Sequence, residues 1–91
     1  MELNKIPLVV TCGVHEKMAE DAGFYTFIMK SLRRYFHHDW GEMCNDDKKM
    51  NDHALGREER IFAAYKNDDC KIYIITEADR SHTTILFPNE Y

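Results

Sequence analysis

The sequence predicts a small α+β domain, and two features of its pattern lead to that class. An amphipathic stretch in the first half is typical of a helix, and the last third alternates short apolar runs with turn formers. Runs of β-branched and aromatic residues separated in this way are typical of an antiparallel meander. A chain of 91 residues with 44% hydrophobic content can bury one core but not two. We therefore expect a single α+β domain over residues 1–91, with an antiparallel sheet and two helices.

The first elements expected are a short strand at residues 8–11 and one long helix. From about residue 16 to residue 36, apolar residues recur at three- and four-residue spacing, which predicts an amphipathic helix. Gly23 weakens its first turns, so we expect the well-formed helix over Asp21 to Phe36, with Asp21 as its N-cap.

A second, shorter helix is predicted near Asp46 to Leu55. Asn45 or Asp46 would be its N-cap, and Gly56 would end it in the left-handed conformation that glycine favours. Its expected apolar side consists of Met43, Met50, Ala54 and Leu55.

Three strands are predicted at residues 60–66, 70–77 and 82–88, separated by turns at 67–69 and 78–81. Alternation places one set of side chains on a common core face, namely Ile61, Ala63, Tyr65, Ile72, Ile74, Thr83, Ile85 and Phe87. The opposite face receives Phe62, Tyr73, Ile75 and Leu86, so it is also partly apolar. Either the two helices cover different faces, or this second face binds something.

The expected core takes residues from both helical and strand segments. Trp40 precedes a glycine at a chain reversal, and we interpret it as a core anchor. The residues expected to be mostly buried are Phe27, Ile28, Leu32, Phe36, Trp40, Ile61, Ile72, Ile74, Ile85 and Phe87.

Composition indicates a cytoplasmic protein. The sequence shows no apolar stretch long enough to cross a membrane, and its beginning lacks the features of a secretory signal. The three cysteines are odd in number and widely spaced, which supports neither a disulfide framework nor a zinc ribbon. No nucleotide-binding or acyl-transfer motif is present, so we expect no cofactor.

The net charge of −4 is concentrated in residues 39–59, which we call the acidic segment. It holds seven acidic residues against three basic ones, and the rest of the chain sums to zero. Such a surface disfavours direct binding to nucleic acid, because neutralising phosphates needs basic side chains. It is compatible with a basic surface on a protein partner, although a solvated face that maintains solubility is the simpler interpretation.

Three places in the sequence contain residue types that carry chemistry. His37, His38, Asp39 and His53 are ligand types for a transition metal, but adjacent histidines on a helix point in different directions. Cys44 could serve as a thiol nucleophile, although neighbouring acids oppose a thiolate. In the turn at 78–81, Arg80 could grip a carboxylate or phosphate, while Asp79 and Ser81 are expected to hold the turn through backbone amides.

Several stretches resemble a family of small proteins from Firmicutes genomes and their plasmids and other mobile elements. The stretches are HHDWGEMCNDDKKMND, ERIFAAY and KIYIITEADRSHTTILFPNEY, which together cover much of the chain. Members are often labelled plasmid-related proteins or restriction-modification subunits. A chain of 91 residues is too short for a methyltransferase fold with its cofactor motif. The resemblance implies a mobile-element accessory protein and supplies no catalytic residues.

Two functional hypotheses follow. The first is a non-enzymatic accessory protein that binds a protein partner, as an inhibitor of a nucleic-acid-targeting defence system of the anti-CRISPR or anti-restriction type. Its acidic side chains would occupy a basic channel as phosphates do. The candidate partner-binding residues are Asp39, Glu42, Asp46, Asp47, Asp52 and Arg80. The alternative is a small metal-dependent hydrolase or nuclease that uses His37, His38, Asp39 and His53.

Overall fold

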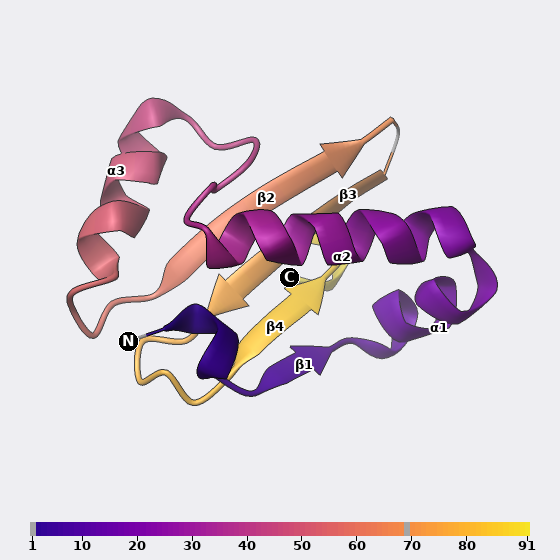
Figure 1. Cartoon of the computed structure of the whole chain (residues 1–91), viewed down its shortest axis with the longest axis horizontal. Coiled ribbons are helices and arrows are strands. Elements are labelled where there is room, and N and C mark those ends of the chain that lie inside the picture. Colours follow the sequence, from indigo (N-terminus) through magenta and orange to yellow (C-terminus); the bar gives the residue numbers. More distant parts are fainter. Residues whose placement is uncertain (1, 69) are drawn as a thin grey trace.

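The computed structural model describes residues 2–68 and 70–91, and its four strands form one mixed sheet (Figure 1). The strands are β1 (Leu8–Val10), β2 (Ile61–Asn67), β3 (Cys70–Thr76) and β4 (Thr83–Leu86), in the spatial order β1-β4-β3-β2. The last three pair antiparallel, with Ala63 opposite Ile74 and Ile74 opposite Ile85. The α+β class and the C-terminal meander are therefore confirmed. Asp69 of the predicted turn lies outside the described residues.

The first strand, β1, runs parallel to β4, so the prediction of a wholly antiparallel sheet is wrong. Leu8 lies opposite Thr83, and Val10 lies opposite Ile85. Along the sequence, the three α-helices of the described chain all come after β1 and before β2. No hairpin turn therefore joins β1 to another strand and sets its direction. The apolar run that predicts this strand is equally compatible with either direction.

Helix α2 (Ala22–Phe36) lies across one face of the sheet and confirms the predicted long helix (Figure 1). Asp21 is its N-cap, because the Phe24 N–H donates a 3.0 Å hydrogen bond to Asp21 Oδ1. The helix buries one stripe, formed by Phe24, Ile28, Ser31, Leu32 and Tyr35. No helix within the described ranges has the length and apolarity that crossing a bilayer requires.

A separate helix, α1 (Cys12–Glu20), precedes α2 and was not predicted. Thr11 caps it, with its hydroxyl accepting from the Val14 N–H. At Asp21 the backbone is extended, with φ −132° and ψ 105°, so the two helices meet at this residue. Asp21 ends α1 through its own N–H, which donates to the Lys17 carbonyl, and begins α2 through its side chain. The apolar periodicity therefore continues across a break that one residue creates.

Helix α3 (Asn45–Ala54) confirms the second predicted helix but corrects both of its ends. Its N-cap is Cys44, whose side chain makes no capping bond, rather than Asn45 or Asp46. At the other end Leu55 is right-handed, and Gly56 does not take the left-handed conformation, since Gly41 is the glycine of the described chain with positive φ. The Arg80 side chain instead donates a hydrogen bond to the Ala54 carbonyl at the end of α3, as described below.

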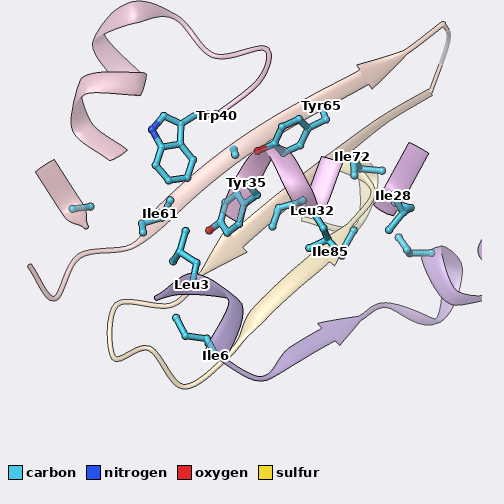
Figure 2. Close-up of a cluster of buried hydrophobic side chains, with 14 of the residues drawn as sticks. Leu3, Ile6, Ile28, Leu32, Tyr35, Trp40, Ile61, Tyr65, Ile72 and Ile85 are labelled. Atoms are coloured by element: carbon cyan, nitrogen blue, oxygen red, sulfur yellow. The ribbon is translucent and has the colours of Figure 1, made fainter. Parts of the chain in front are cut away.

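The core lies between α2 and the sheet, and Figure 2 shows its central side chains. Ile61, Ala63 and Tyr65 of β2 are fully buried, as the predicted alternation requires. Of the residues expected to be mostly buried, Phe27, Phe36 and Phe87 are only partly buried, while the others are at most 6% exposed. Within this core the Tyr35 hydroxyl bonds Thr76, and Thr76 bonds Thr83. Burial raises the pKa of Tyr35 to about 12.

The second face of the sheet is covered by the end of the chain. A 3-10 turn, η2 (Pro88–Glu90), contacts β3, and the Tyr91 ring packs edge-on against Phe62 at 5.4 Å and Tyr73 at 6.0 Å. Phe62 and Tyr73 are themselves 4.7 Å apart and half-buried. Since this cover is a single turn, aromatic surface stays accessible on this face.

Candidate partner-binding surface

The acidic segment follows α2 and forms a short loop, α3 and the connection to β2. It lies beside the outer strand β2 (Figure 1). Each acidic side chain within it either forms hydrogen bonds with other described residues or stays in solvent. That difference divides the predicted residues into those whose side chains are engaged within the fold and those whose side chains face solvent.

Asn51 attaches α3 to the edge of β2. Its side-chain amide donates to the Phe62 carbonyl at 2.8 Å, and its carbonyl oxygen accepts from the Phe62 N–H at 3.2 Å. The side chain thereby bonds β2 as a neighbouring strand would. Asn51 is 5% exposed, and a buried amide is stable only when its polar atoms are bonded. Sequence reasoning missed this residue, because an asparagine in a polar stretch carries no signal of burial.

Gly41 attaches the loop to the same strand. It pairs with Ala64, and the neighbouring Glu42 N–H donates to the Ala64 carbonyl at 2.7 Å. Gly41 has φ +74°, and a Cβ at this position would lie 2.1 Å from the Ala64 oxygen. Only glycine satisfies both the backbone conformation and the close approach.

Trp40 is buried to 2% exposure, which confirms it as a core anchor. Its ring packs edge-on against Tyr35, and the ring of His38 stacks on it at 5.6 Å. Its indole N–H donates to Asp52 Oδ1 at 2.8 Å. This bond joins the loop to α3. The carboxylate of Asp52, a predicted partner-binding residue, is therefore already bonded within the segment.

Asp39 is also engaged within the fold. Its carboxylate accepts from Arg34 Nε at 2.8 Å and Arg34 Nη2 at 3.2 Å, and it also accepts from the Gly41 N–H. The hydrogen bond from Arg34 lowers the pKa of Asp39 and raises that of Arg34. Both side chains are about half exposed, so the pair contributes little to stability.

The Arg80 guanidinium forms hydrogen bonds within the fold. It donates to the carbonyls of Ala54, Arg57 and Glu59 at 2.6, 2.7 and 2.6 Å, and also to Glu77 at 3.0 Å. It thus joins the β3–β4 turn to the end of α3. The predicted turn is present, with Asp79 accepting from the Ser81 N–H, whereas the Ser81 hydroxyl pairs with His82 Nδ1 rather than with a backbone amide. Interaction with the Ser81 side chain, followed by the bond from the Ser81 N–H, lowers the pKa of Asp79.

The remaining predicted residues, Glu42, Asp46 and Asp47, are all exposed. Their carboxylates form no hydrogen bond or ion pair with other described residues. Asp46 and Asp47 lie in the first turn of α3, where negative charge suits the positive end of the helix dipole. Three of the six predicted residues therefore present carboxylates to solvent from a fixed backbone.

The histidine cluster does not assemble into a metal site. His37 ends α2, His38 stacks on Trp40, and His53 lies in the last turn of α3. Within residues 2–68 and 70–91, no group of three or more His, Cys, Asp or Glu side chains could hold a metal ion. Cys44 is exposed at the N-cap of α3.

Comparisons of this chain with protein-family models, curated proteins and solved structures find no match.

Proposed function

We propose that the protein is a non-enzymatic accessory protein that binds a basic surface of a macromolecular partner through the acidic segment. The observation that carries this proposal is the exposure of Glu42, Asp46 and Asp47 on a segment fixed to the sheet by Asn51 and Arg80. Charges held on a fixed backbone lose little conformational freedom on binding.

The kind of partner follows from the charge and from the resemblance to mobile-element proteins. Such elements meet nucleic-acid-targeting defence complexes of their host, whose channels are basic because they bind phosphates. An acidic surface that occupies such a channel competes with nucleic acid through complementary charge. We therefore propose an inhibitor of a host defence complex, of the anti-CRISPR or anti-restriction type.

The test begins with affinity purification from the native host and measures association rates with the recovered partner at two salt concentrations. The variant Glu42→Gln/Asp46→Asn/Asp47→Asn removes the exposed charges and should slow association about tenfold at low salt, since complementary charge steers encounter. The control Glu2→Gln/Glu16→Gln/Glu20→Gln changes net charge equally at exposed positions outside the segment. If both variants associate with the partner at equal rates, and the rates do not depend on salt, the acidic segment serves only to keep the protein in solution and the proposal is wrong.

A further inference from the structure

A groove of about 320 Å³ lies between α3 and the beginning of β2. Its apolar lining is Met43, Met50 and Phe62, and its charged lining is Asp47, Glu59 and Arg60. Asn51, which bonds the Phe62 backbone, fixes the two walls relative to each other. The groove therefore exists without rearrangement of the fold.

The two carboxylates give the groove its charge. Asp47 lies in the first turn of α3, Glu59 lies just before β2, and both are exposed. Arg60, the cation of the lining, is directed to Tyr91, with its Nη1 donating to the tyrosine hydroxyl at 3.0 Å and its guanidinium over the ring at 5.3 Å. The acidic groups thus remain available to a cation from outside.

The apolar lining suits a particular kind of cation. The Phe62 ring is half-buried and belongs to the aromatic group with Tyr73 and Tyr91, while Met50 is 67% exposed. An exposed methionine beside an aromatic ring is typical of interaction surfaces, because the thioether adapts its shape to a ligand. A flat cation with an aliphatic stem can interact favourably with both kinds of side chain, because the cation stacks on the Phe62 ring and the stem contacts the methionines.

We propose that this groove binds an arginine side chain of the protein partner, with the guanidinium between Asp47 and Glu59 and the stem over Met43 and Met50. Arginine fits better than lysine, because its planar guanidinium stacks on Phe62 while donating to carboxylates. The inference rests on the proposed function, since it names the feature of the basic partner that the acidic segment recognises. Arginine is also prominent among the residues that dominate binding energy at protein interfaces.

The test uses the intact protein and Nα-acetyl-arginine amide as the probe, followed by NMR titration of backbone amides and methionine methyls. Shifts should localise to Phe62, Met43 and Met50, and the uncharged analogue Nα-acetyl-citrulline amide should bind about tenfold more weakly because the ionic contact is lost. Asp47→Asn/Glu59→Gln should weaken arginine binding about tenfold, and Met50→Ser several-fold. The control Glu16→Gln/Glu20→Gln, on α1 and outside the groove, should change it less than twofold.

Several results would overturn the proposal. Equal loss of arginine binding in Glu42→Gln/Asp46→Asn and in the groove variant would mean diffuse attraction, although the proposed function would stand. Shifts spread over the acidic segment, or equal binding of citrulline, would have the same meaning. A dimer in sedimentation that Met50→Ser dissociates would identify a second copy as the occupant. The opposite combination is also informative. If arginine binds in the groove but the charges of the acidic segment do not affect partner association, the proposed function is wrong and the groove remains an arginine-binding site.

Discussion

Helices α2 and α3 are attached to the same sheet by different chemistry. α2 lies on the core face through an apolar stripe that includes Phe24, Ile28 and Leu32. α3 buries little apolar surface, with Asn51 and Ala54 as its buried residues, and polar side chains hold it in place. Apolar attachment is spread over many contacts, whereas polar attachment is concentrated in a few bonds. We therefore expect substitutions in α2 to affect the whole fold and substitutions around α3 to act locally.

The largest effect is expected for Ile28→Ala on α2. Ile28 is fully buried, so the substitution removes transfer energy and leaves a cavity, at a cost of about 2–5 kcal/mol in the free energy of unfolding. Denaturant unfolding measures this cost. The matched control is Met29→Ala on the same helix, which is 47% exposed and should change stability by less than about 0.5 kcal/mol. Similar losses in the two variants would mean that α2 is not attached through this stripe.

An intermediate effect is expected for Asn51→Ala. The substitution removes both bonds to the Phe62 backbone and should cost about 1–3 kcal/mol, because two polar groups at the strand edge lose their partner. Amide exchange should accelerate at Phe62 and throughout α3 more than in α2, since local opening precedes global unfolding. Asn45→Ala, at the exposed start of α3, is the control and should leave these rates nearly unchanged. Uniform acceleration in both helices would contradict the difference in attachment.

The smallest effect concerns Asp39, which pairs with Arg34 at the junction between α2 and the loop. Because the fold lowers the pKa of Asp39, the pair stabilises the protein above the pKa of the unfolded chain, near about pH 4, and loses this contribution as pH falls through the folded pKa. The two side chains are about half exposed, so the gain is below about 1 kcal/mol.

The measurement compares wild type with Asp39→Asn in denaturant unfolding at neutral and strongly acidic pH. The stability difference between the two proteins should be small at neutral pH and vanish in acid. A difference that grows in acid would reverse the expected sign and exclude this pair as its cause.

The contrast between a repeated apolar stripe and a few individual bonds also explains which features could be predicted from the sequence. The stripe of α2 and the alternation of β2, β3 and β4 repeat over many residues, so the periodicity predicts the helix, the meander and the buried set. The break at Asp21 and the parallel direction of β1 depend on one residue and on a distant pairing, which periodicity does not record. For the candidate surface, composition identifies the acidic segment. It cannot separate Asp52 and Arg80, whose side chains bond distant parts of the chain, from Glu42, Asp46 and Asp47 in solvent.

The bonding of Asn51 and Gly41 along β2 also covers part of an edge strand. An unpaired strand edge is a template for aggregation, and β2 is a seven-residue strand with apolar and aromatic side chains on both faces. The opposite edge, β1, has three residues and is preceded by Pro7, so it offers little template. Conditions that detach α3 while leaving the meander folded would therefore expose the longer edge and promote fibrillar pairing between molecules. We therefore expect α3 to hinder amyloid-like association between molecules, whether or not it also binds a partner.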